Sequence, residues 1–188
     1  MHLRPSDHLL DLVGAAVEVP VRLAQMHNST FTLRNVADIE RTLCAAPASL
    51  GAHPAPETPA DLLDHSCLLL RFPGSEQFRW SLLDGDEAVT IPVSGRIDPD
   101  DSDVLTEWAL QGQGIVLKPV YEVAPYLAEG RLVPVLPETP PTSVTLGVVY
   151  SSRKVLPNRA KTFVEMMTEA LRGYVGGQLV LVGRRVAR

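Results

Sequence analysis

The feature that most constrains the fold is a regular alternation of two kinds of apolar segment along the chain. Short apolar runs rich in β-branched residues, such as GIVLKP and VTLGVVYS, have the length and composition of buried strands. Between them lie segments with apolar residues at helical spacing, the longest from about Pro157 to Tyr174. Strands that alternate with helices are typical of an α/β architecture, and we expect mostly parallel strand pairing.

Turn and capping residues mark the limits of several elements. Thr58 is a natural N-cap and Pro59 fits the first helical position, which predicts a short helix that ends near His65. An Asp-Gly turn separates the apolar runs FRWSLL and AVTIPVSGRI. This pattern predicts a β-hairpin near the middle of the chain, in which Trp80 packs into the core.

The second half of the chain carries three further helical signals. Asp100, Asp101 and Ser102 supply capping residues before a helical period that stops at Gly112. A second helix closes at Gly130. The stripe of the last helix comprises Phe163, Val164, Met167, Leu171 and Tyr174, which we expect to face the core. After it, QLVLVGRRVAR is compatible with either an extra strand or an irregular tail.

Size and charge restrict the class of function. The chain has 188 residues, of which 45% are hydrophobic, enough for one domain or two small lobes. Its net charge is −5, and no Lys/Arg-dense stripe precedes the C-terminus, so we expect no direct binding to DNA. No run of about eighteen apolar residues and no signal-peptide pattern occur, so we expect a cytoplasmic chain without membrane contact.

Motifs for catalysis and metal binding are absent from the sequence. GxSxG, GxxxxGK[ST], HExxH and a dinucleotide-binding glycine fingerprint do not occur, so we expect neither an enzyme nor a cofactor. Cys44 and Cys67 lie in apolar surroundings without a CxxC partner, and we expect reduced, packed thiols. A Cys44 nucleophile is the alternative for an enzyme. The five separated histidines do not predict a metal site.

Several segments together resemble the regulatory domain of LysR-type transcriptional regulators. They span about Asp7 to Tyr174, in the family's order: DLVGAAVEVPVRLAQ, LCAAPASLGAHPAPETPADLLDHSCLLLRFPGS, the Trp of FRWSL, ALQGQGIVLKP, and LAEGRLVPVLP followed by VVYSSRKVLPNRAKTFVEMM. The resemblance implies a type 2 periplasmic-binding-protein-like fold: two α/β lobes joined by two crossing strands, with a small-molecule effector between them.

Carried onto this chain, the resemblance implies crossings near 67–71 and 147–151. Lobe one then comprises 1–69 and 149–175, lobe two comprises 70–148, and 176–188 is a tail. The family's helix-turn-helix and the first strand, helix and strand of lobe one have no counterpart here, so we expect an incomplete first lobe. We also expect a homo-oligomer that reaches DNA only through the missing helix-turn-helix domain.

The resemblance also implies an effector site made of residues from both lobes. The family commonly has Asn-Asp where this chain has Asp100-Asp101, a change that disfavours an anionic effector and leaves neutral or cationic ones open. Two alternatives need no ligand: an Asp that only caps the helix, and a Ser75 hydroxyl bonded to its own turn. The expected site residues are Arg22, Ser29, Phe72, Gly74, Ser75, Asp100, Asp101 and Ser102.

The leading hypothesis is therefore an effector-binding regulatory domain that acts by binding. One alternative is a solute-binding receptor of the same fold, against which the lack of a signal peptide argues. The other is a remnant that senses nothing and pairs with full-length regulators, drawing them into inactive dimers.

Overall fold

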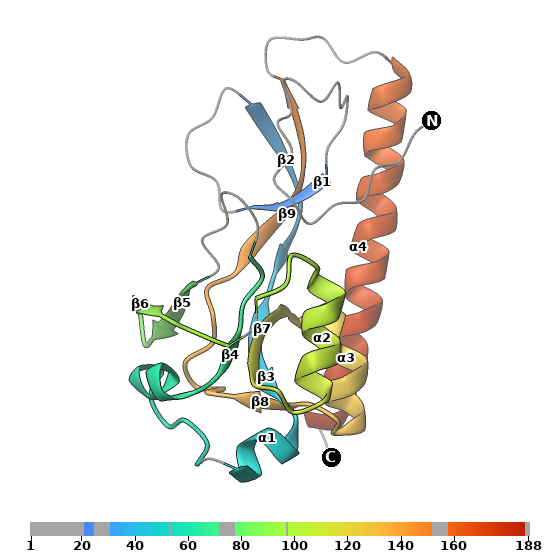
Figure 1. Ribbon diagram of the computed structural model, residues 1–188. Helices are drawn as coiled ribbons and strands as arrows, with labels where there is room; N and C mark the ends of the chain where they lie inside the picture. Colours follow the sequence, from blue (N-terminus) through green and yellow to red (C-terminus); the bar gives the residue numbers. More distant parts are fainter. Residues whose placement is uncertain are drawn as a thin grey trace. The chain divides into compact units, whose positions relative to one another are not determined.

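The computed structural model describes residues 21–24, 31–52, 54–71, 78–96, 98–151 and 158–186 (Figure 1). They belong to two compact units. The first contains Arg41–Thr142, and the second contains the described residues of Asp11–Glu40 and Ser143–Arg188. Both combine strands with helices, which confirms the expected α/β class.

The first unit is built on a four-stranded sheet in the order β4-β7-β3-β8. β7 pairs parallel with β4 but antiparallel with β3, and β3 also pairs antiparallel with β8. The expected mostly parallel pairing is therefore wrong for the described sheets, because an apolar strand pattern carries no information on strand direction. The strands are β3 (Arg41–Ala45), β4 (Cys67–Leu68), β7 (Ile115–Pro119) and β8 (Val133–Val135).

Side chains on the two faces of this sheet enter two different core clusters. Leu43 and Ile115 join Trp80 in one cluster, whereas their neighbours Cys44 and Val116 join the other. This is the two-residue period of a strand covered on both faces. The helices of this unit are α1 (Pro47–Ala52), the 3₁₀ helix η1 (Pro59–Asp64), α2 (Ser102–Leu110) and α3 (Val120–Glu129).

The predicted hairpin is confirmed, and so are the predicted limits of η1, α2 and α3. β5 (Arg79–Asp84) and β6 (Glu87–Pro92) pair antiparallel around the Asp-Gly turn, where Gly85 has a φ of 61°. Trp80 is 2% exposed, as expected for a core residue. Figure 1 shows this hairpin on one side of β7 and the helices α2 and α3 on the other.

The second unit has a three-stranded antiparallel sheet in the order β1-β9-β2. Its strands are β1 (Val21–Ala24), β2 (Phe31–Ile39) and β9 (Val144–Ser151), and its helix is α4 (Asn158–Val186). α4 contacts β2.

The last helix differs from its predicted form in two respects. Val164 is buried as expected, but Tyr174 is 56% exposed and does not face the core. The helical period instead buries Thr168 and Val175. The segment 178–186 is neither a strand nor an irregular tail, because it continues α4.

The limits of the compact units differ from the limits expected for the lobes. The chain passes between units at 40/41 and 142/143, whereas the expected lobe limits were 69/70 and 148/149. Cys67, at the expected first crossing, lies in β4 inside the first unit. Gly147, at the expected second crossing, lies in β9 inside the second unit. The assignment of residues to lobes remains a prediction.

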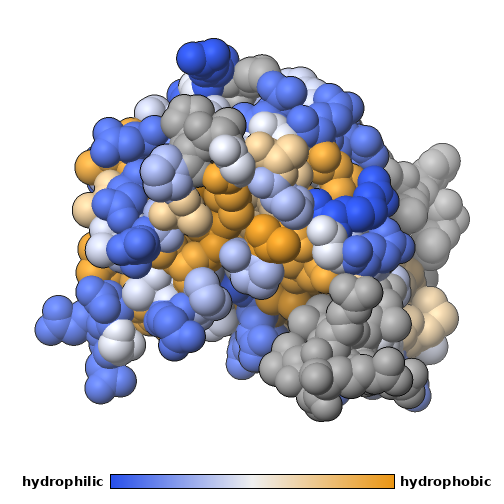
Figure 2. Space-filling model, turned by 90° about the horizontal axis from the view of Figure 1, so that it is seen from below, coloured by the Kyte–Doolittle hydropathy of each residue, from blue (hydrophilic) through white to orange (hydrophobic). Residues whose placement is uncertain are grey.

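Figure 2 shows hydrophobic side chains gathered near the middle of the drawn face, with hydrophilic side chains among and around them. Within the described ranges, no helix combines the length and apolar character that crossing a bilayer requires.

Candidate functional site

The structure describes only part of the expected effector site. Asp100, Asp101 and Ser102 are described in full, at the start of α2. Arg22 is described only as backbone in β1. The remaining expected residues, Ser29, Phe72, Gly74 and Ser75, lie outside the described residues, so their place in the site remains a prediction.

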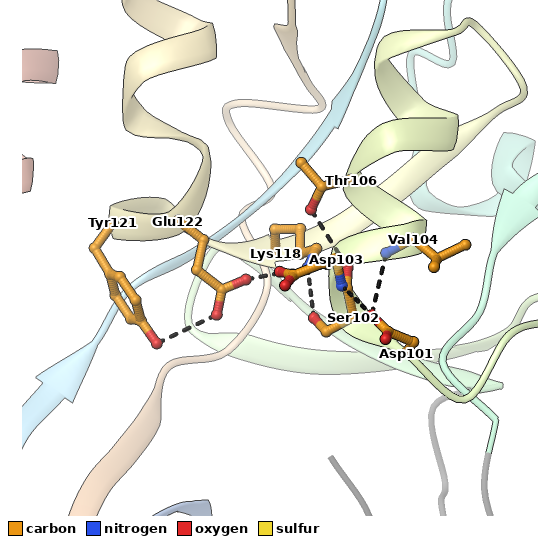
Figure 3. A network of polar contacts seen from close by, with 8 residues as sticks. All are labelled: Asp101, Ser102, Asp103, Val104, Thr106, Lys118, Tyr121 and Glu122. Carbon is orange, nitrogen blue, oxygen red and sulfur yellow. Dashed lines mark hydrogen bonds and ion pairs between the residues drawn. The ribbon is translucent and has the colours of Figure 1, made fainter. Parts of the chain in front are cut away.

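Asp101 is the N-cap of α2. Its Oδ1 accepts hydrogen bonds from the backbone N–H of Asp103 at 2.8 Å and of Val104 at 3.3 Å (Figure 3). The capping role considered in the sequence analysis is therefore confirmed. These N–H groups at the start of a helix are the ones that would bind an anion. Because they already donate to Asp101, they are not available to a carboxylate ligand.

Lys118 joins this helix start and was not among the expected site residues. It lies in β7, on the same face of the strand as Val116, and is 2% exposed. Its Nζ donates to the backbone oxygen of Ser102 at 2.7 Å and to the Ser102 Oγ at 2.5 Å. The sequence did contain a signal for Lys118. A lysine inside the apolar run GIVLKP needs a hydrogen-bond partner if the strand is buried.

Glu122 balances the charge of Lys118. Lys118 Nζ lies 3.1 Å from Glu122 Oε2, in the first turn of α3. The hydroxyl of Tyr121 donates to the other carboxylate oxygen of Glu122 at 3.2 Å. Figure 3 shows a chain of polar contacts from Ser102 through Lys118 and Glu122 to Tyr121, with the Asp101 cap beside it. The network connects the first turns of α2 and α3 through β7.

Carboxylates predominate around this network. Asp98, Asp100, Asp101 and Asp103 lie within six residues of one another. Arg71, which approaches from the end of another segment, forms an ion pair with Asp98 and donates its backbone N–H to Pro99 at 2.8 Å. Arg71 and Lys118 are thus each paired with a carboxylate.

The cysteines show no sign of activation. Cys44 and Cys67 are both free and fully buried. Burial raises the pKa of each thiol to about 12, although the nearby charge of Lys118 lowers the pKa of Cys44 in part. A nucleophilic cysteine needs a lowered pKa, so this geometry argues against a Cys44 nucleophile. Among the residues that the structure describes, no cluster of three metal-ligating side chains occurs.

The comparison with known proteins shows that this α/β chain is a regulatory domain of the type 2 periplasmic-binding-protein-like class. This chain belongs to the LysR substrate binding domain family, whose sequence profile matches residues 1–172. The expected family and fold are confirmed.

Several relatives and solved structures support this membership. The HTH-type transcriptional activator TtdR of Escherichia coli (strain K12) is 31% identical over 138 residues, which cover 73% of this chain and 44% of TtdR. The HTH-type transcriptional regulator DmlR of the same strain is 30% identical over 164 residues, which cover 87% of this chain and 53% of DmlR.

The regulatory domain of CrgA from Neisseria meningitidis is similar in structure. It has a TM-score of 0.70 and 27% identity, and the match covers 85% of this chain and 78% of that domain. The chain spans about half the length of the curated relatives that it matches. These relatives are transcriptional regulators rather than enzymes.

Proposed function

We propose that this chain is the effector-binding regulatory part of a LysR-type transcription regulator and that it acts by binding a small molecule. The observation that carries this proposal is the family match over residues 1–172, which includes the whole of the first unit. The burial and raised pKa of Cys44 and Cys67 argue against a thiol nucleophile. In this proposal the protein is cytoplasmic, and contact with DNA belongs to a separate helix-turn-helix domain.

The proposed binding position is the start of α2. Asp100 and Ser102 lie at this position, and Lys118 supports it from β7. The other expected members, Arg22, Ser29, Phe72, Gly74 and Ser75, complete the proposed site.

The proposed regulation follows from differential binding. A ligand that binds one conformation of an oligomer more tightly than another shifts the population toward the first. A shift from 1:99 to 99:1 requires about a 10⁴-fold difference in affinity. We propose a homo-oligomer as the assembly. Effector binding can then change the geometry between subunits and, through it, the way in which the regulator contacts DNA.

A thermal-shift screen of the purified chain tests the proposed function. The library contains aliphatic and aromatic acids, amino acids, amides and sugars. A compound that binds only the folded state at 100 times its Kd adds about 2.7 kcal/mol to the free energy of unfolding, which raises Tm by several degrees. We expect such a compound to raise the Tm of the Ser81→Ala variant but not the Tm of the Ser102→Ala variant.

Ser81 is a matched control because its hydroxyl bonds Thr90 Oγ1 within the hairpin. If the chain unfolds cooperatively and no compound raises its Tm, the result contradicts the sensing proposal. If a compound raises the Tm of the Ser102→Ala variant as much as that of the unaltered chain, the binding site does not lie at the start of α2.

A further inference from the structure

One side chain holds together the two places where the chain passes between the compact units. Arg41 and Thr142 are the first and last residues of the span that forms the first unit. They are 101 residues apart in the sequence, yet Arg41 donates two hydrogen bonds to Thr142. We infer that this contact joins the two connections into one hinge, whose backbone rotations are confined to Glu40 and Ser143. The inference goes beyond the proposed function, because the hinge requires no effector.

On the side of the second unit, strand pairing holds the two connections together. β2 and β9 pair antiparallel as far as Ile39 and Val144, which lie opposite each other. If this register continued by two residues, Arg41 would lie opposite Thr142. The ladder stops short of that position, because β2 ends at Ile39 and β9 begins at Val144.

On the side of the first unit, the Arg41 guanidinium takes the place of that ladder. Its Nε donates to the backbone oxygen of Thr142 at 2.7 Å, and its Nη2 donates to Thr142 Oγ1 at 3.1 Å. The guanidinium is planar and holds its N–H groups in a fixed geometry, so two bonds to one residue restrain the separation of the two segments. Burial lowers the pKa of Arg41, but an arginine remains protonated at neutral pH.

Both partners of the Arg41–Thr142 contact are anchored within the first unit. Arg41 begins β3 and lies opposite Pro119 of β7 in the four-stranded sheet. Thr142 donates its backbone N–H to the oxygen of Ser81 in β5 at 2.9 Å. The contact thus connects the four-stranded sheet to the β5–β6 hairpin. Neither connection can shift within the first unit without moving the other.

Glu40 and Ser143 are the residues left between these two restraints. Neither belongs to a strand, and both are exposed. Hinges are formed by a few residues at the ends of secondary-structure elements that absorb changes in φ and ψ. Because the connections are held together on both sides of this pair, a rotation at Glu40 requires a matching rotation at Ser143.

Residual dipolar couplings of the backbone amides in the full chain test this hinge. They are fitted separately for the two units, and the degree of order of the less ordered unit is divided by that of the other. We expect this order ratio to lie near one in the unaltered chain. Glu40→Gly increases backbone freedom at the hinge and should lower the order ratio. Asp86→Gly, in the exposed hairpin turn, should leave it unchanged.

Arg41→Met removes the restraint on the side of the first unit and should also lower the order ratio. Hydrogen exchange reports the lost contact directly: the amides of Thr142 and Leu83, which donate to Ser81 and Pro140, should exchange about tenfold faster. Arg41→Lys keeps a cation that can reach one acceptor, so its order ratio should be intermediate. If Arg41→Met does not fold, Thr142→Val provides the test, because it removes only the hydroxyl acceptor.

Val93→Ala is the control for stability, because it truncates a buried side chain of the first unit that takes no part in the Arg41–Thr142 contact. It should lower Tm and leave the order ratio unchanged. The inference is overturned if Glu40→Gly lowers the order ratio no more than Asp86→Gly does. An order ratio that stays the same when the Arg41–Thr142 contact is removed also overturns it. The library screen tests effector binding separately, so neither result bears on the proposed function.

Discussion

Arg172 Nε donates a hydrogen bond of 2.7 Å to the backbone oxygen of Val36 and so attaches α4 to an irregular point of β2. The pairing of β2 with β9 shifts between Asn35 and Ala37, so Val36 has no partner in the strand register. Val36 is 3% exposed. A buried carbonyl at a bulge needs a donor from elsewhere, and Arg172 supplies one.

The first prediction concerns this contact. Arg172→Met keeps most of the side chain but leaves the Val36 carbonyl without its donor, so the free energy of unfolding should fall by about 1–2 kcal/mol. Urea unfolding measures the difference. Lys161→Met is the control, because Lys161 is exposed on the same helix. Equal losses in the two variants would show that the Arg172 contact is not stabilising.

The second prediction concerns the buried ammonium of Lys118. Glu122→Gln removes the opposing charge, so we expect a loss of about 1–3 kcal/mol, less than for a fully buried pair because Glu122 is 32% exposed. Glu129→Gln, on the same helix and 58% exposed, should change stability by less than about 0.5 kcal/mol. Chemical unfolding at pH 7 distinguishes the two. If Glu122→Gln leaves the free energy of unfolding unchanged, the ion pair with Lys118 is not formed in solution.

The third prediction is a loss of stability at alkaline pH. Burial raises the pKa of Cys44 and Cys67 from 9.0 to about 12, so the folded state holds these protons more tightly than the unfolded state. Their contribution is complete below pH 9 and is lost as the pH rises from 9 toward 12. Between pH 8 and pH 10.5 we expect a loss of about 1–2 kcal/mol per thiol.

The double variant Cys44→Ala/Cys67→Ala controls for other groups that titrate at high pH. Its unfolding free energy should fall less steeply over the same interval. Parallel pH profiles would be the contrary result, as would rapid alkylation of the folded protein by iodoacetamide at pH 8.

The fourth prediction separates the capping role of Asp101 from its charge. Asp101→Ala removes the acceptor for two N–H groups and should cost about 1 kcal/mol, whereas Asp101→Asn keeps an acceptor and should cost only a few tenths. Thermal unfolding at pH 7 ranks the two variants. If Asn costs as much as Ala, the carboxylate charge rather than the cap stabilises this helix start.

The fifth prediction tests a close approach of two backbones. A Cβ on Gly95 would overlap the backbone oxygen of Cys67 in β4, so Gly95→Ala should destabilise the protein by about 2–3 kcal/mol. Gly51 in α1 has open space around it. Gly51→Ala should be neutral or stabilise by up to about 1 kcal/mol. Similar Tm values for the two variants would contradict the close packing at Gly95.

The sequence by itself determined those features that depend on neighbouring residues. The Asp-Gly turn specified the β5–β6 hairpin, because only a few residue pairs adopt that turn. Asp101 specified the start of α2, and Gly112 and Gly130, with φ of 76° and 72°, specified the ends of α2 and α3. The order of such segments was also sufficient to identify the family, although not the effector.

Only the tertiary structure decided which distant segments meet. Apolar strand patterns do not state a partner or a direction, so the antiparallel pairing of β3 with β7 and the unit limits at 40/41 and 142/143 were not foreseen. Lys118 and Ser102 are sixteen residues apart, and no local pattern connects them. Their contact forms because a buried ammonium must be hydrogen-bonded, and the fold brings its acceptors within reach at the starts of α2 and α3.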